Sequence, residues 1–293
     1  MQINFHELPK LRDSLSYFYL EHSIVDRKDN AIEYIQKDGR TMVPIASLCL
    51  LILGPGTSIS HAAVKVLSEN GCLILWTGED VTPYYAFGLG ETRKAYHLLR
   101  QAELVCNNDS RIKVVRNMYE FRFSNFDHDA SLSQLRGMEG ARVKAAYAKA
   151  SKTYGIEWTG RQYNRGDWSD ADPINRALSA ANALLNGICH AAIISGGYSP
   201  ALGFIHTGRQ LSFVYDIADL YKAEITIPAA FEVVAASPMN VEKRVRINCR
   251  QKIKDTHLLQ RILPDIDSIL EIDEPSEEMF GEDPVSELWE GLD

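Results

Sequence analysis

Two aspartates and one histidine lie close together in the segment LGFIHTGRQLSFVYDIADLYK, which covers residues 202–222. Asp216 and Asp219 are three residues apart, so a helix beginning near Val214 would project both carboxylates from one face. With His206, they form a set of ligand types that divalent metal ions accept. Each residue also has an ordinary alternative: Asp216 could cap the helix, Asp219 could be a first-turn acid, and His206 could be a hydrogen-bonded structural residue.

A fourth candidate, Glu139, lies further upstream in QLRGMEGARVKAAY. Gly137 and Gly140 bracket this carboxylate inside an otherwise helical pattern. A glycine costs about 1 kcal/mol relative to alanine in a helix interior. Two of them around one acid therefore indicate that another backbone or a bulky substrate approaches there. Taken alone, Glu139 could equally be a surface residue.

The first ninety residues have the pattern of β-strands. Short runs of β-branched and aromatic residues are separated by turn signals, and the pair Asp38-Gly39 predicts a hairpin. One helix is predicted after a cap at Ser58 or Ser60. The predicted strands cover residues 15–20, 31–36, 41–45, 48–53, 72–76 and 84–88, and the helix covers residues 61–69. Residues 1–90 thus predict a small β-rich, β-sandwich-like domain with one helix.

From residue 91 the spacing of apolar residues becomes helical. The predicted helices cover residues 92–106, 111–123, 132–154, 174–190, 214–224, 229–236, 241–254 and 257–269. Residues 91–270 therefore predict a larger all-helical domain, joined to the first near residues 87–93. The fold class expected for the whole chain is α+β, with residues 271–293 as an acidic and flexible tail.

Charge is distributed unevenly along the 293 residues, whose net charge is -8. Residues 265–293 contain 12 acids and no lysine or arginine, whereas residues 91–264 contain 17 acids and 24 bases. Because nucleic-acid binding needs a positive surface, the basic body fits that function better than the overall charge does. Acidic tails of this kind often serve as interaction segments.

Two basic runs occur in the helical region. One helix carries Arg111, Lys113, Arg116 and Arg122, and another contains six bases, which include Arg244, Arg246 and Arg250. Two such runs in one domain favour a DNA-binding surface. Each run could also be an ordinary solvated helix face.

The five cysteines are scattered and form no C-x-x-C pair, which argues against a disulfide framework and against a zinc cluster. The first residues do not resemble a secretion signal, and the apolar run near residues 45–53 is too short to cross a bilayer. We therefore expect a cytoplasmic protein that makes no contact with a membrane.

Several motifs together resemble a known family. They are RGMEG, FIHTG and VYDIADLYK, supported by PGTSISHAAV near Pro55 and RIKVVRNMY near Arg111. The sequence is similar to the CRISPR-associated integrase subunit, the first protein of the spacer-acquisition pair, in its type I-E branch. The resemblance extends over nearly the whole chain.

This resemblance implies a homodimer with a β-rich N-terminal domain that contributes to dimerisation and DNA contact. It also implies a divalent-metal site, Mg²⁺ or Mn²⁺, formed by Glu139, His206 and Asp219, with Asp216 as a further catalytic acid. The implied reaction joins the 3′-ends of captured foreign DNA to the CRISPR repeat by transesterification, with endonuclease activity on branched DNA. The implied partners are double-stranded and branched DNA and a small second CRISPR acquisition protein.

Further residues fall on motif positions that would face DNA, namely Arg136, Tyr215 and Lys222. His22 and Asn186 stand where tyrosines are expected in better-known relatives. Two other functions fit the same motifs. One is a DNA-binding scaffold with a non-catalytic metal site, and the other is a metallohydrolase that acts on a small phosphoester.

The acidic tail contains an apolar stripe formed by Val285, Leu288, Trp289 and Leu292. We interpret this stripe as a docking segment for the small second acquisition protein. The dimer of that protein would then bridge two dimers of this chain.

Overall fold

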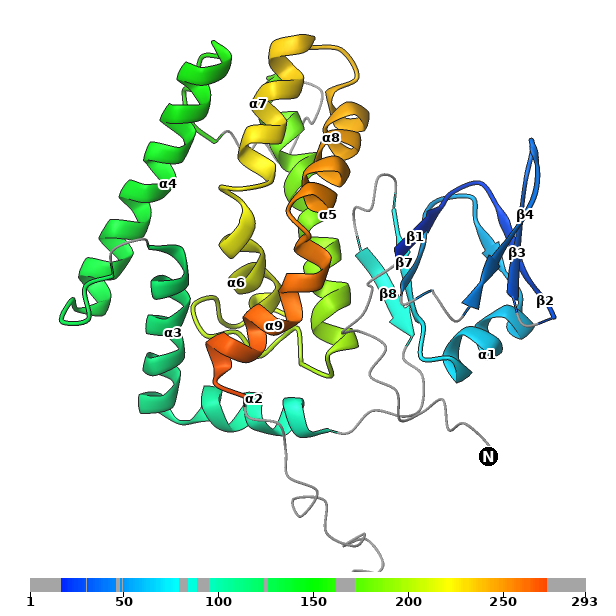
Figure 1. The fold of residues 1–293 in the computed structure, drawn as a ribbon, viewed down its shortest axis with the longest axis horizontal. Helices are drawn as coiled ribbons and strands as arrows, with labels where there is room; N and C mark the ends of the chain where they lie inside the picture. The colour runs from blue at the N-terminus through cyan, green and yellow to red at the C-terminus, as the bar shows by residue number, and fades with distance from the viewer. Residues whose placement is uncertain are drawn as a thin grey trace, which may run out of the picture.

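The structure is a computed structural model of the chain. It describes residues 17–29, 31–45, 48, 50–78, 84–88, 95–123, 126–161 and 172–272. The acidic tail expected to bind a partner lies outside the described residues, except for Glu271 and Ile272. Strands gather on one side of the molecule and helices on the other (Figure 1).

The strands of the described part form two sheets of four. One has the order β1-β5-β7-β8 and the other β4-β3-β2-β6, with helix α1 beside them. Strands β1, β5 and β7 run parallel, and β8 is antiparallel to β7. The elements are β1 (Tyr17–Leu20), β2 (Ile24–Lys28), β3 (Ala31–Gln36), β4 (Gly39–Pro44), β5 (Leu50–Leu53), β6 (Ser58–Ile59), α1 (His61–Glu69), β7 (Leu73–Thr77) and β8 (Tyr84–Gly88).

The predicted hairpin joins β3 to β4. Gln36 pairs with Gly39, so the two-residue turn consists of Lys37 and Asp38, one position before the pair that predicted it. Gly39 has a φ of 145°, a conformation that residues with a side chain rarely adopt. Strands β2 and β6 were not expected from the sequence.

Alternation along β5 and β7 places the first sheet between two hydrophobic cores. Leu51 and Ile74 belong to the core inside the β-rich part. Their neighbours Leu50, Ile52 and Leu75 belong instead to the core of the helical part. Because side chains alternate between the faces of a strand, one sheet can serve both cores. The two parts of the molecule therefore share one continuous packing interface.

Eight helices of the described chain form the second part. They are α2 (Tyr96–Cys106), α3 (Asn108–Arg122), α4 (Leu132–Tyr154), α5 (Pro173–Ser195), α6 (Ser212–Tyr221), α7 (Thr226–Ala236), α8 (Val241–Asp255) and α9 (Leu258–Leu270). The expected α+β class, with strands first and an all-helical region after them, is confirmed.

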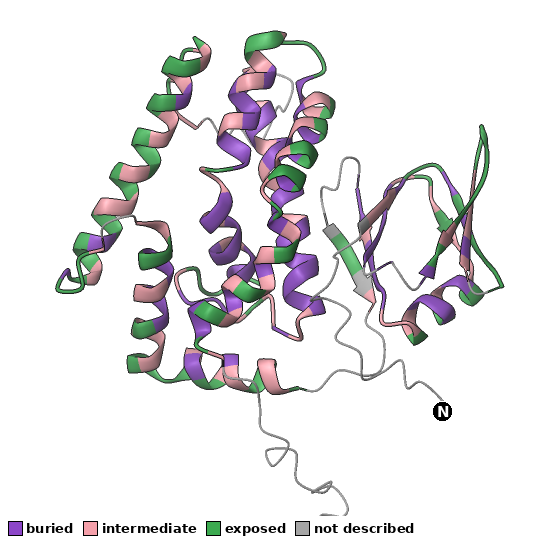
Figure 2. Cartoon of the chain, in the orientation of Figure 1, coloured by how far each residue is buried: buried purple, intermediate pink, exposed green. Residues whose placement is uncertain are grey.

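Helix α5 is the central element of this part (Figure 2). Asp172 caps its first turn by accepting a hydrogen bond from the backbone N–H of Asn175, at 2.7 Å. By length and composition α5 could cross a membrane, although no such segment was expected from the sequence. However, 72% of its most apolar window is buried inside the fold. Its apolar composition is therefore explained by its place in the core, among α6, α7, α8 and α9.

Helix α4, which carries Glu139, lies along the outer edge of the helical part (Figure 1). Ser131 and Gln134 form a capping box at its start, and Gly155 ends it with a φ of 67°. Only Leu135 and Ala150 are fully buried along its 23 residues. This helix is thus held at few points and leaves most of its surface open to a ligand.

Candidate active site

The candidate site is built around the loop that connects α5 to α6. Gly203 allows this loop to fold tightly, because a Cβ at this position would lie 2.3 Å from the backbone oxygen of His206 and 2.7 Å from Cβ of Ser212. The Ser212 hydroxyl also donates to the carbonyl oxygen of Arg209, at 2.8 Å. The loop therefore turns back on the first residue of α6 and presents His206 beside that helix.

Two side chains from other helices fix the same loop. Gln101 of α2 is fully buried; it donates to the carbonyl oxygens of Ser199 and Leu202, both at 3.0 Å, and accepts from the N–H of Ser199 at 2.7 Å. Arg111 of α3 donates twice to the carbonyl oxygen of Phe204, at 2.9 and 3.1 Å. These contacts satisfy buried backbone groups that would otherwise cost free energy.

Asp216 is the internal anchor of the loop. It is completely buried, and its carboxylate accepts from the backbone N–H groups of Phe204, Ile205 and His206 at 2.6, 3.1 and 2.9 Å. A fourth bond joins its Oδ1 to the Nδ1 of His206, at 2.7 Å. Because the carboxylate is 0% exposed, the contacts that the structure shows for Asp216 position the loop and His206. Its predicted role as a catalytic acid stays a prediction.

His206 is oriented by that bond. Since an ionised carboxylate only accepts hydrogen bonds, Nδ1 carries the proton and the neutral ring keeps its lone pair on Nε2. Nε2 lies 4.0 Å from Oδ2 of Asp219, and 44% of the His206 side chain is exposed. The hydrogen bond to Asp216 raises the pKa of His206, although partial burial opposes this. Both aspartates of α6 therefore reach the same imidazole, one at each ring nitrogen.

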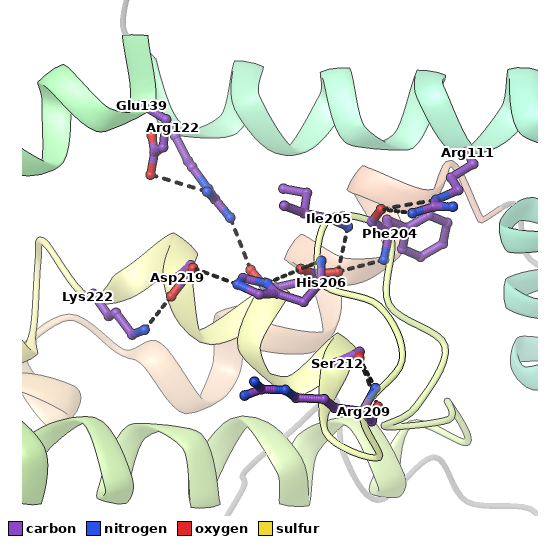
Figure 3. Close-up of polar contacts among 11 residues, drawn as sticks. Arg111, Arg122, Glu139, Phe204, Ile205, His206, Arg209, Ser212, Asp219 and Lys222 are labelled. Carbon is purple, nitrogen blue, oxygen red and sulfur yellow. Dashed lines mark hydrogen bonds and ion pairs between the residues drawn. The ribbon is translucent and has the colours of Figure 1, made fainter. Parts of the chain in front are cut away.

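Glu139 is held by two arginines rather than by the histidine and aspartate. Arg142 donates to both of its oxygens, at 2.9 and 3.1 Å, and Arg122 donates to Oε1 at 3.2 Å. The guanidinium of Arg122 also donates to the backbone oxygen of Asp216, at 3.2 Å, so it connects α4 to α6 (Figure 3). Asp219 has a cationic partner of its own, Lys222 (Figure 3).

The predicted metal ligands fit a divalent ion only in part. Two donors that each lie about 2.1 Å from one cation are roughly 3 to 4 Å apart, which agrees with the 4.0 Å between Nε2 of His206 and Oδ2 of Asp219. A lone-pair nitrogen beside a carboxylate oxygen is also a suitable donor pair. Within the described part of the chain, however, no three His, Cys, Asp or Glu side chains are grouped closely enough to hold a metal. Glu139 remains the third predicted ligand, and its carboxylate oxygens are occupied by Arg122 and Arg142.

Known proteins are similar to this chain over most of its length. The family model described as CRISPR associated protein Cas1 matches residues 17–128 and 120–250 of this chain. The chain belongs to the Cas1 family. The resemblance seen in its motifs is thereby confirmed.

Individual Cas1 proteins are similar over nearly the whole length. A relative from Thermus thermophilus, named CRISPR-associated endonuclease Cas1 2, is 50% identical over 97% of this chain and 87% of its own. A Cas1 endonuclease of Escherichia coli is 42% identical over 89% of this chain and 86% of its own. The crystal structure of a TtCas1-DNA complex superposes with a TM-score of 0.75, over 90% of this chain and 99% of that one, at 50% identity.

The residues expected to face DNA differ in exposure in this Cas1 chain. Arg136 is exposed and lines a pocket of about 180 Å³ beside Phe204 and Ile205 of the loop between α5 and α6. Tyr215 is half-buried, and its ring meets His206 edge-on with 6.0 Å between centroids. Lys222 is partly exposed next to Asp219. All three surround the loop that carries His206.

The basic run on α8 is corrected in part. Arg246 is only 8% exposed, and Arg244 donates to the carbonyl oxygens of Ser237 and Met239, at 2.7 and 3.3 Å, where α7 ends. Arg246 is therefore packed inside the helical part of this Cas1 chain, and Arg244 binds the C-terminal end of α7, where a cation is favoured. Arg250 is exposed and remains available to a ligand.

The unusual residues of this Cas1 chain also have defined places. His22 adopts a φ of 49° and its N–H donates to the carbonyl oxygen of Pro55, at 2.9 Å. A Cβ on Gly56 would lie 2.4 Å from its Nδ1, so the ring packs directly over that turn. Asn186 lies on α5, and its buried Oδ1 has no hydrogen-bond partner among the described residues. Neither position carries the tyrosine that better-known relatives are expected to have there.

Sequence reasoning missed the residues that hold the site. Arg111 and Arg122 were interpreted as parts of a basic or solvated face, but Arg111 binds the carbonyl oxygen of Phe204, and Arg122 binds Glu139 and the backbone of Asp216. Gln101 and Gly203 were not singled out. A Cβ added to either glycine beside Glu139 would meet no atom of the described residues within 4 Å, so no other described segment of this chain approaches them. The expected approach of a bulky substrate stays a prediction.

Proposed function

We propose that this Cas1 protein is a divalent-metal-dependent DNA integrase, with associated endonuclease activity on branched DNA. It joins the 3′-ends of captured foreign DNA to the CRISPR repeat. The main support is the pair formed by His206 and Asp219, because Asp216 fixes the imidazole so that Nε2 faces the second carboxylate. Membership of a family whose relatives are named endonucleases supports the same class of reaction.

The ligands of the cation would be Glu139, His206 and Asp219, and the ion would be Mg²⁺ or Mn²⁺. When bound, such an ion polarises the scissile phosphodiester and stabilises the leaving 3′-oxygen. Asp216 keeps the proton of His206 on Nδ1, so that Nε2 stays free of a proton when the ring is neutral. Lys222 and Arg142 lie at the edge of the site, where they can neutralise phosphate oxygens.

The reaction needs no nucleotide cofactor. A 3′-hydroxyl attacks a phosphodiester of the repeat, one phosphodiester bond forms, and one breaks with release of a 3′-oxygen. The number of phosphodiester bonds is unchanged. If water attacks in place of the hydroxyl, the same site carries out hydrolysis, which accounts for the endonuclease activity.

The proposed partners are double-stranded and branched DNA, a second copy of this chain, and the small second CRISPR acquisition protein, all in the cytoplasm. The similar protein TtCas1, whose structure is that of a complex with DNA, supports the first of these. The docking segment for the small protein would be the apolar stripe of the acidic tail. Deletion of residues 276–293 should abolish co-purification with that protein, and an undiminished complex would refute the docking role.

A second function is favoured by one observation. Glu139 is bound to Arg122 and Arg142 and is not grouped with His206 and Asp219. This arrangement would suit a DNA-binding scaffold of the acquisition complex whose metal site is not catalytic. The two functions differ in whether the carboxylates are needed for strand joining.

The decisive experiment measures strand transfer and DNA binding in the same variants. Glu139→Gln and Asp219→Asn should abolish strand transfer in the presence of Mg²⁺ or Mn²⁺ and leave DNA affinity nearly unchanged. Glu157→Gln is the matched control, since Glu157 is exposed beyond the end of α4. Normal strand transfer by both site variants would favour the scaffold. Turnover of small phosphodiesters with little effect of salt on binding would instead favour the metallohydrolase.

A further inference from the structure

The carboxylates of the candidate site are already neutralised by side chains of this chain. Glu139 is paired with Arg122 and Arg142, and Asp219 is paired with Lys222. Asp216 is enclosed by N–H groups. A divalent cation that enters this site therefore meets three positive side chains beside the carboxylates that it needs.

The three cations differ in their access to solvent. Arg122 is only 3% exposed, and its Nε has no partner among the described residues. A buried guanidinium needs its counter-ion, so Arg122 is held to Glu139. The side chains of Arg142 and Lys222 are 25% and 33% exposed, so both can turn toward solvent. Arg122 is therefore the fixed cation of the site, and Arg142 and Lys222 are the exchangeable ones.

A nucleic-acid phosphate offers the exchangeable cations another partner. Arginine binds phosphate and carboxylate with the same paired N–H groups, and lysine binds both as a point charge. When a phosphate takes Arg142 and Lys222, Oε2 of Glu139 and Oδ1 of Asp219 lose their cationic partners, while Oε1 of Glu139 stays with Arg122 and Oδ2 of Asp219 already faces Nε2 of His206. Each carboxylate then has an oxygen and a negative charge that a metal can use.

We propose that DNA phosphate and the divalent cation enter this site together by an exchange of partners. Phosphate binds Arg142 and Lys222, and the released carboxylates of Glu139 and Asp219 bind the cation. This inference rests on the proposed metal-dependent function. It adds that the affinity of the site for metal is low when no DNA is bound. Because coupling between two ligands is reciprocal, metal raises the affinity for DNA by the same factor.

The test is a titration of the full-length protein with Mn²⁺, in which the electron paramagnetic resonance signal reports the free ion. It is carried out without DNA and with a DNA duplex whose 3′-ends lack the hydroxyl group, so that no joining occurs. We expect Mn²⁺ to bind more tightly with DNA by a factor in the range of roughly 5 to 150. Arg142→Gln and Lys222→Gln should each tighten Mn²⁺ binding in the absence of DNA. Each should also reduce the factor by which DNA raises the Mn²⁺ affinity.

Arg100→Gln is the matched control. Arg100 pairs with Glu103 at 2.7 Å on α2, three residues apart like Arg142 and Glu139, but outside the site. This variant should leave both Mn²⁺ affinities unchanged. Equal Mn²⁺ affinity with and without DNA, or site variants that behave like Arg100→Gln, would overturn the exchange while leaving a metal-dependent enzyme intact. Absence of Mn²⁺ binding under both conditions would overturn the exchange and the proposed function together.

Discussion

His206 is bonded to Asp216 through Nδ1 at 2.7 Å, while the backbone N–H of the same histidine bonds to the same carboxylate oxygen at 2.9 Å. The backbone position and the ring orientation of His206 are thus set by one buried atom. Any change to that atom affects the fold of the loop and the direction of Nε2 at once.

The first prediction concerns Asp216→Asn. The asparagine keeps the shape of the side chain but replaces one acceptor oxygen by an NH₂ group, which faces N–H donors of the loop. Leaving buried donors unsatisfied costs about 1–3 kcal/mol for each group. We expect the free energy of unfolding to fall by roughly 2–5 kcal/mol and strand transfer to be lost. Urea unfolding and a strand-transfer assay measure the two effects, and wild-type values in both would show that Asp216 does not anchor the loop.

The second prediction compares two glycines. Gly203→Ala places a methyl group 2.3 Å from the backbone oxygen of His206, so the loop has to shift. Gly137→Ala meets no atom within 4 Å among the described residues and lies inside α4. We expect Gly203→Ala to lower the melting temperature and strand transfer, and Gly137→Ala to raise stability by up to about 1 kcal/mol. Thermal unfolding of both variants provides the measurement, and equal effects would contradict the assigned packing.

The third prediction is a pH dependence of stability due to His190. This side chain is 2% exposed on α5, and burial lowers its pKa from 6.5 to about 4. Below pH 6.5 the unfolded chain binds a proton at His190, whereas the folded protein does not bind it until the pH approaches 4. The free energy of unfolding therefore decreases as the pH falls toward 4. Relative to His190→Leu, the free energy of unfolding of the wild type should fall by about 1.4 kcal/mol for each pH unit in this window. Urea unfolding at pH 6.5, 5.5 and 4.5 tests this. The prediction is wrong if the free energy of unfolding changes with pH by the same amount in the wild type and in His190→Leu.

The fourth prediction concerns the solvent face of α8. Lys243, Arg250 and Lys254 are exposed on it, whereas Lys252 pairs with Glu232 of α7 at 2.9 Å. If the exposed face binds DNA, replacing its three cations by glutamine should weaken binding to all DNA sequences. The slope of log affinity against log salt should decrease by about one for each lost phosphate contact.

The control for α8 is Lys252→Gln, which changes the same charge on the same helix but on the packed face. Fluorescence anisotropy at several salt concentrations measures both variants. If the triple variant keeps the wild-type slope, the face does not contact phosphate, and the exposed cations are only solvated.

Much of the fold follows from local signals in the sequence. The limits of α1, α4, β3 and β8 agree with the predicted ranges 61–69, 132–154, 31–36 and 84–88. Helix α4 was well defined because a capping box begins it and a glycine ends it. Strand β2 was missed because its sequence, IVDRK, lies at an exposed position and buries only Val25. Its pattern becomes a strand only through pairing with β3 and β6.

The site was predictable where its residues are neighbours in sequence. Asp216 and Asp219 share α6, and His206 lies ten positions from Asp216. The role of Arg122 could not be predicted in this way, because its partners Glu139 and Asp216 lie 17 and 94 residues away. Such a role depends on how three helices pack together. The spacing of residues within one segment does not predict that packing. The sequence therefore identified the chemical groups and left their pairing open.

The central claim is that Glu139, His206 and Asp219 bind one divalent cation. Its most direct test is a crystal structure of the full-length protein with DNA and Mn²⁺, in which anomalous scattering locates the ion. We expect one peak in contact with Nε2 of His206 and with oxygens of Asp219 and Glu139, at about 2.0–2.4 Å. A structure in which DNA is bound, Glu139 still lies on Arg122 and Arg142, and no ion lies beside His206 would contradict the account.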